Sequence, residues 1–339
     1  MKKNLIILIL IVSTILTGCK VGKENFSQYQ TVRRTFFPMD TFLEIVLQVQ
    51  DEKAANEAID RAYAEVERLE NLLSATIEKS EITAINKNAG IRPVKVSSET
   101  FYLLEKGIEY GELTDGKFDI TIAPLLKLYN WKEGRVHGEL PPSEEIKKAM
   151  ELVNYQAIQL HEEKMEVYLP VKGMEIDLGG IAKGYIIDKA VEVLKEHGIK
   201  YGYVNGGGDI RFLGPKYDGN PWRIGITNPR GQGNIAVVEV NDGAIVTSGD
   251  YERYYITKDG QRIHHIIDPH TGLSAIYAQS VTIYASNATI ADILSTTLFM
   301  FQPTEGLKLA KNLGVEALII SSNGEIYMTT KMKEMTNLN

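Results

Sequence analysis

The chain has 339 residues, of which 44% are hydrophobic and 24% are charged, a balance typical of a globular protein with one large domain or two medium ones. Its formal net charge of −7 disfavours nucleic acid as a partner, because attraction to phosphates supplies most of that affinity. The single cysteine, Cys19, excludes an internal disulfide.

The first 19 residues have the pattern of a bacterial lipoprotein leader. Two lysines precede an apolar stretch at 5–16, which is too short for a comfortable transmembrane helix. The stretch ends in Leu-Thr-Gly-Cys, which matches the lipobox, so residues 1–18 are expected to be a cleaved signal peptide and Cys19 a lipidated residue. An uncleaved anchor is the alternative. With residues 19–35 as lipidated cysteine and tether, we expect a domain on the extracytoplasmic face of a bacterial cell membrane.

From Phe36 onward the pattern mixes strands and helices. Alternation of apolar and polar residues predicts a half-buried strand at 41–49, and apolar residues at helical spacing predict a helix at 53–73. Further helices are expected at 97–113, 143–153, 181–197, 287–301 and 304–313, and strands at 201–205, 222–227, 236–240, 280–285 and 315–321, the last followed by a hairpin turn at 323–324. No regular βαβ repeat is present, so the sequence predicts one large α+β domain over residues 36–335, with one or two lobes.

Three segments place polar and glycine residues where a core would be apolar. Residues 114–121 (TDGKFDIT) set two carboxylates around a glycine turn, which a solvated turn would also explain. Residues 176–185 (IDLGGIAKGY) join a strand end to a helix start, where backbone N–H groups and Lys183 favour an anion. A tight turn with a surface lysine is the alternative, and the spacing is not that of a P-loop. Residues 204–210 (VNGGGDI) leave bare backbone for a ligand, or form a bulge.

A fourth segment, 264–272 (HHIIDPHTG), follows residues 247–251 and holds three of the six histidines. His264 and His265 point to opposite faces of an extended chain, so they are not expected to bind one metal together. One could act as a general base, since its pKa lies near working pH, and Asp268 could orient it. Zinc is the rival interpretation, although no third ligand has a convincing spacing.

A fifth feature indicates a metal. Asp292 and Thr296 lie four residues apart in a predicted helix and therefore share one face. A carboxylate with a hydroxyl suits magnesium or calcium. An exposed aspartate beside a threonine that bonds back into its own helix is the alternative. Because the flanking residues are strongly apolar, we expect this face to point inward, where a metal would offset the cost of burying a carboxylate.

Taken in order, these five segments resemble the ApbE-like FAD:protein FMN transferases over about Phe36 to Phe299. The resemblance implies an α+β, T-fold-related domain, with FAD as substrate, Mg²⁺ as cofactor and an acceptor flavoprotein carrying a threonine flavinylation motif as partner. It implies FAD contacts by Met39, Thr76, Lys117, Phe118, Asp119, Asp177, Lys183, His264 and His265, magnesium ligation by the Gly180 carbonyl, Asp292 and Thr296, and catalytic roles for His265, Asp268 and Lys183. His265 is the expected base. The chain departs from the family at Asp40, where glycine is usual.

The implied reaction is the attack of a threonine hydroxyl on the FMN-side phosphorus of FAD, with AMP as the leaving group. Two alternatives share the same residues. Water in place of threonine would make the protein a magnesium-dependent FAD pyrophosphatase that gives FMN and AMP. A lipoprotein that only holds FAD would need the binding groups without the base.

Overall fold

The computed structural model describes residues 28–129 and 139–338. The predicted signal peptide and the lipidation site Cys19 therefore lie outside the described residues. Within those two ranges, none of the helices combines the length and the apolar character needed to cross a bilayer.

The centre of the fold is an eight-stranded sheet in which every neighbouring pair of strands is antiparallel. Its strands, in spatial order, are β1 (Gln30–Phe36), β2 (Leu43–Val49), β6 (Gly202–Gly206), β7 (Asp209–Phe212), β10 (Ala244–Gly249), β13 (Ala278–Ala285), β14 (Glu316–Ser321) and β15 (Ile326–Met328). The sheet also carries candidate site residues, since β7 begins with Asp209 and β10 ends in the polar run at 247–249.

The central strands face a core on each side. In β14, Ala317 and Ile319 join the core beneath the helices, whereas Leu318 and Ile320 join a second core on the opposite face. A strand buried on both faces has no reason to alternate between apolar and polar residues. This explains the nearly continuous apolar run at 316–321, which the sequence correctly predicts as a strand.

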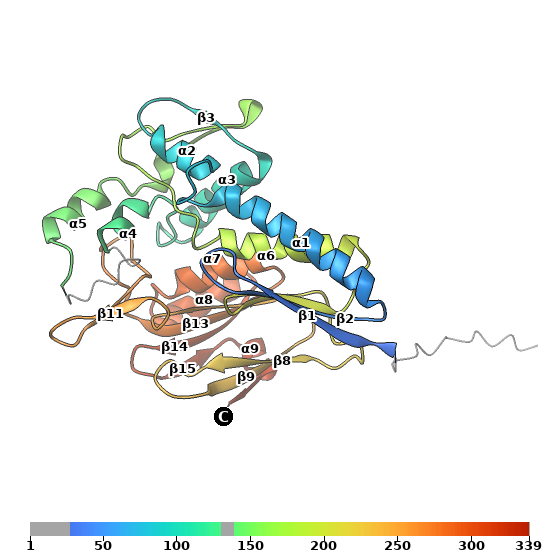
Figure 1. The fold of residues 1–339 in the computed structure, drawn as a ribbon. Coiled ribbons are helices and arrows are strands. Elements are labelled where there is room, and N and C mark those ends of the chain that lie inside the picture. Colours follow the sequence, from blue (N-terminus) through green and yellow to red (C-terminus); the bar gives the residue numbers. More distant parts are fainter. Residues whose placement is uncertain (1–27, 130–138, 339) are drawn as a thin grey trace, which may run out of the picture.

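Different layers cover the two faces of the main sheet (Figure 1). Helices α1 (Glu52–Leu73), α6 (Ala182–Glu196), α7 (Ala288–Leu298) and α8 (Pro303–Asn312) cover one face, and the small sheet of β8 (Trp222–Thr227), β9 (Asn234–Val240) and β16 (Thr336–Leu338), with α9 (Thr330–Met335), covers the other. The helical layer is the one that carries α6 and α7, and with them the predicted metal residues.

Residues 74–129 and 139–178 form a further part of the domain beyond the helical layer (Figure 1). Its elements are α2 (Glu81–Lys87), β3 (Val94–Lys95), α3 (Ser98–Leu113), α4 (Ala123–Tyr129), α5 (Ser143–Met150), β4 (Gln159–His161), β5 (Glu166–Tyr168) and 3-10 turns at Tyr155–Ala157 and Glu162–Lys164. A third core joins α4 and α5 to the hairpin of β11 (Tyr254–Ile256) and β12 (Arg262–His264). The predicted α+β class is confirmed.

β1 corrects the predicted tether. Gln30–Phe36 pairs along its whole length with β2, so the last part of the expected 19–35 tether belongs to the folded domain. Val32 is the one side chain of β1 that is buried. An edge strand with so little apolar alternation gives almost no signal in the sequence.

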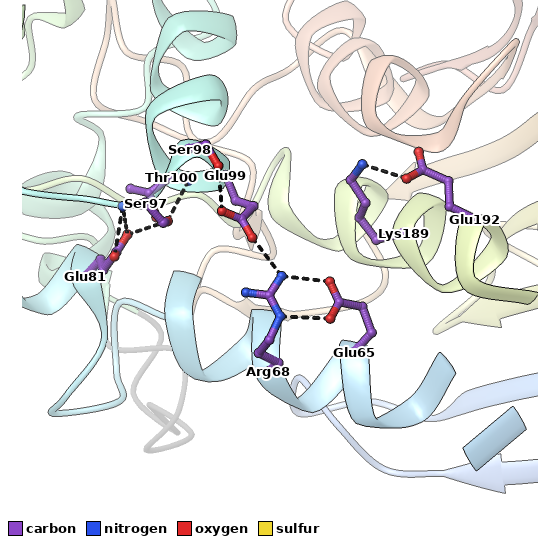
Figure 2. Close-up of polar contacts among 9 residues, drawn as sticks. All are labelled: Glu65, Arg68, Glu81, Ser97, Ser98, Glu99, Thr100, Lys189 and Glu192. Carbon is purple, nitrogen blue, oxygen red and sulfur yellow. Dashed lines mark hydrogen bonds and ion pairs between the residues drawn. The ribbon is translucent and has the colours of Figure 1, made fainter. Parts of the chain in front are cut away.

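One ion pair joins α1 of the helical layer to α3, and a second lies within α1 (Figure 2). Arg68 donates to Glu65 on its own helix at 2.8 and 2.7 Å and to Glu99 on α3 at 2.7 Å. With Tyr185 and Lys189 of α6, these side chains line an open polar cavity of about 380 Å³. The residues predicted for FAD, metal or catalysis do not line it.

Candidate functional site

Helices α6 and α7 approach closely at the start of α6. The backbone N–H of Gly184 donates to Asp292 Oδ2 at 2.9 Å. A Cβ atom on Gly184 would lie 2.3 Å from the carbonyl oxygen of Ala288, so a glycine is required for the two backbones to come this near. Before α6, a Cβ on Gly180 would lie 3.6 Å from Thr296 Oγ1. The helices therefore bring Gly180, Asp292 and Thr296 together, as the magnesium prediction requires.

The donor set at this position consists of oxygen atoms. Asp292 is 4% exposed, and burial raises the pKa of its carboxyl group while Lys183 and the Gly184 N–H lower it. Thr296 Oγ1 lies 3.4 Å from Ser248 Oγ at the end of β10. Nowhere in the described ranges do three His, Cys, Asp or Glu side chains gather as a metal cluster. One carboxylate with hydroxyl and main-chain oxygens fits a hard cation such as Mg²⁺ better than zinc.

Lys183 connects three of the predicted segments. Its ammonium group forms an ion pair with Asp209 of β7, which is 1% exposed. Asp209 Oδ1 also accepts a hydrogen bond of 3.1 Å from the backbone N–H of Thr247. Burial lowers the pKa of Lys183, and the negative charge of Asp292 opposes this shift. The ion pair with Asp209 holds the Lys183 amino group in place, where it could bind an approaching phosphate.

The turn that precedes α6 is fixed by hydrogen bonds to other segments. The backbone N–H of Asp177 donates to the Ile120 carbonyl at 2.8 Å, and its carboxylate accepts from the Gly179 N–H at 2.7 Å. The amide of Asn86 brackets Ile176, accepting from its N–H at 2.7 Å and donating to its carbonyl at 2.9 Å. Asp177 therefore has a defined position beside the 114–121 loop.

The 114–121 loop lies against the same turn. Phe118 is buried, and its ring edge would be 3.2 Å from a Cβ on Gly180. Asp119 accepts from the N–H and hydroxyl of Thr121 at 2.7 and 2.6 Å and from the Tyr155 N–H at 3.0 Å. Burial raises the pKa of Asp119. The described bonds of this carboxylate shape the loop, and its contact with FAD stays a prediction.

Lys117 joins this loop to the histidine segment. Its ammonium group lies 2.6 Å from Asp268 Oδ2, and both side chains are largely buried. Asp268 Oδ1 accepts from the His270 N–H at 2.9 Å. The sequence suggests that Asp268 orients a histidine side chain. The structure instead directs its carboxylate to Lys117 and to its own loop, because the fold brings residues 151 positions apart into contact.

The two adjacent histidines have different surroundings. His264 is buried, with Nε2 2.8 Å from the Ala275 carbonyl oxygen and Nδ1 accepting from the Ile266 N–H at 3.3 Å. A carbonyl can only accept, so Nε2 carries the proton and both ring nitrogens are in use. Burial lowers the pKa of His264. This residue is held within the protein, and its contact with FAD stays a prediction.

His265 is half-buried and more available. Its Nδ1 lies 3.4 Å from the carbonyl oxygen of Arg253, which places the proton on Nδ1 and the lone pair on Nε2. Desolvation, followed by the charge of Arg253, lowers the pKa of His265 to about 3. The imidazole is therefore neutral near pH 7, and it is a weaker base than a histidine whose pKa lies near working pH. The sequence assigns no role to Arg253, although the residue lies beside the polar run at 247–251.

Met39 and Asp40 form a turn between β1 and β2. Their φ angles are 56° and 55°, and the Thr41 N–H donates to the Pro38 carbonyl at 3.0 Å. Positive φ at both central residues is the requirement of a type I′ hairpin turn, which favours glycine. This explains physically why a glycine suits the position of Asp40. Met39 N–H donates to Glu70 Oε1 at 2.7 Å, which fixes the turn against α1.

Thr76 lies in the loop after α1. Its N–H donates to Ser74 Oγ at 3.1 Å, and its hydroxyl is 3.0 Å from the same atom. The described bonds join it to Ser74 and not to the other predicted residues. Its contact with FAD stays a prediction.

The chain is similar in sequence to proteins of a known family. Residues 39–319 match the model of the ApbE family. The chain is 34% identical to a FAD:protein FMN transferase of Treponema pallidum (strain Nichols) over 78% of this chain and 76% of the relative. It is 32% identical to a protein of the same name from Klebsiella pneumoniae (strain 342), over 80% of this chain and 85% of that one.

Solved structures show the same fold. The ApbE protein of Thermotoga maritima superposes with a TM-score of 0.85 at 35% identity, over 90% of this chain and 99% of that one. The flavin transferase ApbE of Vibrio cholerae superposes with a TM-score of 0.78 at 29% identity, over 91% and 99%. A family match over most of the chain, with structures that share its fold, leads to one conclusion: the chain belongs to the ApbE family.

Proposed function

We propose that this protein is a magnesium-dependent FAD:protein FMN transferase, which moves FMN from FAD to a threonine hydroxyl of an acceptor flavoprotein and releases AMP. The observation that carries the proposal is the cluster of Gly180, Asp292 and Thr296 beside the ion-paired Lys183. Relatives that cover most of the chain bear the name FAD:protein FMN transferase, which supplies the flavin and the protein acceptor.

The metal site would be formed by the Gly180 carbonyl, the Asp292 carboxylate and the Thr296 hydroxyl. When bound, Mg²⁺ would neutralise charge on the pyrophosphate of FAD. Lys183 supplies a second positive charge from α6, and its ion pair with Asp209 limits the positions that the ammonium group can take. Asp292 combines a buried carboxylate with one backbone donor, so a cation would reduce the cost of its burial.

The transfer is a displacement at the FMN-side phosphorus. The threonine oxygen forms a bond to that phosphorus, the bond to the AMP oxygen breaks, and AMP leaves with its electron pair. The threonine proton passes to the Nε2 lone pair of His265, the histidine whose ring keeps an acceptor atom available. His264 is less suited to this role because both of its ring nitrogens are already hydrogen-bonded.

One experiment separates transfer from its two alternatives. The protein is mixed with FAD, Mg²⁺ and candidate acceptor flavoproteins, and the products are followed by in-gel flavin fluorescence and by AMP release. A fluorescent acceptor together with AMP is expected. AMP without a labelled acceptor would instead identify an FAD pyrophosphatase. Tight FAD binding with neither product would identify a protein that only holds FAD.

The same proposal includes a lipid anchor. Cys19, behind an apolar leader and a lipobox, is the proposed lipidation site, and the domain would then work at the extracytoplasmic face of a bacterial cell membrane. Expression in a bacterial host with a labelled fatty acid should label the wild-type chain in the membrane fraction. Cys19→Ser should abolish the label. A labelled Cys19→Ser variant, or an unlabelled wild type, would contradict the anchor.

A further inference from the structure

The contacts that α6 and the turn before it make with α7 repeat at intervals of four residues. Gly180 lies beside Thr296 and Gly184 beside Asp292. Four residues further along α6, Asp188 reaches the start of α7, four residues before Asp292. Residue numbers rise on one helix as they fall on the other, so the pair is antiparallel, and one turn separates each contact from the next. The predicted metal residues occupy two of these levels, and Asp188 occupies the third.

Asp188 binds the N-terminus of α7 through both of its carboxylate oxygens. Oδ1 accepts from the Ala288 N–H at 2.9 Å, and Oδ2 accepts from the N–H and the hydroxyl of Thr289 at 2.8 and 2.7 Å. The N–H of Ile290 is bound by Asn287 at 2.9 Å. Two of the free N–H groups that begin α7 are thus satisfied by a side chain from α6, whose negative charge also complements the positive end of the helix dipole.

Asp188 is itself held from the opposite side. Arg211 of β7 places Nε 3.2 Å from Asp188 Oδ1. The Arg211 guanidinium donates to the carbonyls of Phe212 and Gly243 at 2.6 and 2.7 Å and lies 3.1 Å from Asp242. Asp188 is 9% exposed. Because the Asp188 carboxylate is buried and paired with Arg211, it cannot move with α7 if that helix slides along its axis.

Sliding of α7 along its axis would displace the residues of the proposed metal site. A shift of one residue moves a helix by about 1.5 Å along its axis and turns its side chains by about 100°. Metal ligands must lie within about 0.2 Å of their usual distances, and Mg²⁺ demands near-ideal geometry. The close contact at Gly184 prevents the helices from coming nearer, and its N–H donates to Asp292, which is itself one of the metal residues. Asp188 supplies directional attraction that selects one register.

We propose that Asp188 is a positioning residue that sets the register of α7 against α6 and thereby the magnesium affinity of Gly180, Asp292 and Thr296. The inference rests on the proposed function, since it concerns the same metal site. Asp188 touches neither metal nor substrate. Its loss should therefore weaken metal binding more than it slows the reaction once metal is saturating.

The test compares Asp188→Asn and Asp188→Glu with the wild-type protein. The dissociation constant of Mg²⁺ is measured by calorimetry on the folded protein, without reference to turnover. We expect it to rise about tenfold or more in both variants, the size usual for groups that support metal ligands. AMP release from FAD at saturating Mg²⁺ should fall less than about threefold, because bound metal holds its ligands in position.

The choice of variants separates the effect of the negative charge of Asp188 from the effect of the position of its carboxylate. Asp188→Glu keeps the charge but moves the carboxylate by a methylene, so wild-type affinity in this variant would overturn the proposal. Asp242→Asn is the matched control, because Asp242 also pairs with Arg211 but its side chain is 62% exposed. It should bind Mg²⁺ as the wild type does, and an equal loss of affinity there would also overturn the proposal.

A structural role alone gives a different result. If Asp188→Asn lowers the melting temperature while Mg²⁺ affinity stays unchanged, the proposal is wrong. Should the Asp188 variants not fold, Thr289→Val removes one hydrogen bond to Asp188 at constant charge and must shift Mg²⁺ affinity in the same direction by a smaller factor. The wild-type arm tests the proposed function separately. If the wild type turns over FAD but binds no Mg²⁺, the positioning proposal fails while FAD chemistry stands.

Discussion

The two sides of the candidate site are built in different ways. On the helix side, Gly184 and Asp292 lie in a backbone contact between α6 and α7 that excludes even one additional carbon atom. On the histidine side, His265 and Asp268 belong to the segment after β12, and their contacts are hydrogen bonds and one ion pair between loops. Substitutions on the helix side should therefore alter metal binding, and those that add volume to the backbone contact should also alter folding. Substitutions on the histidine side should alter mainly the rate.

The largest effect is expected at Asp292. Asp292→Ala should reduce Mg²⁺-dependent AMP release by about 10³-fold, since a group that stabilises developing charge is worth this much. The free energy of unfolding without metal should change little, because burial disfavours the charged carboxylate. AMP release against Mg²⁺ concentration is the measurement. Asp60→Asn, an exposed aspartate on α1, is the control, and equal activity in the two variants would remove the proposed metal site.

The next largest effect is expected at Gly184. In Gly184→Ala the new methyl group meets the Ala288 carbonyl, so the helices must separate and the free energy of unfolding should fall by about 3 kcal/mol. Denaturant unfolding measures this. Gly107→Ala on α3 is the matched control, because its nearest atoms are the side-chain carbons of Ile120, which can move. If Gly107→Ala lowers the free energy of unfolding as much as Gly184→Ala does, contact with backbone atoms is no more costly than contact with side-chain atoms, and the prediction is wrong.

On the histidine side, His265→Ala should slow FMN transfer by about 10²-fold, the usual contribution of a general base. Mg²⁺ affinity and the melting temperature should stay near their wild-type values. Because the pKa of His265 is lowered to about 3, its neutral form is retained as pH falls from 8 to 5 and is lost only near pH 3. A pH profile of the transfer rate with a fall near pH 6.5 that disappears in His265→Ala would contradict this lowered pKa.

The smallest effect is expected at the β1–β2 turn. A left-handed residue other than glycine costs about 1–2 kcal/mol, and glycine has an entropic cost of about 0.5–1 kcal/mol. Asp40→Gly should therefore raise the free energy of unfolding by at most about 1 kcal/mol. Thermal unfolding measures this, with Asp40→Val as the opposite case, since a β-branched residue at positive φ should destabilise the turn. A clear loss of stability in Asp40→Gly would show that contacts of the Asp40 side chain outweigh its strain.

The local sequence determined those features whose physical cause lies within a single helix or strand. The helix predicted at 53–73 is confirmed as α1, because its apolar residues at helical spacing all face the core. The start of α3 is set by Ser97, whose hydroxyl accepts from the Thr100 N–H at 3.3 Å. The four-residue spacing of Asp292 and Thr296 also places both on one face of α7 without any knowledge of the fold.

Tertiary structure decided which of these local pieces meet. The pair of Lys117 with Asp268 joins positions 151 residues apart, and no local pattern specifies that contact. β1 was not predicted because an edge strand buries little apolar surface. Its extended conformation is fixed by its pairing with β2. The register of α7 against α6 depends on Gly184 and Asp188 together, because hydrogen bonds and excluded volume act through space. The sequence contains these residues, but only the folded chain brings them to the same site.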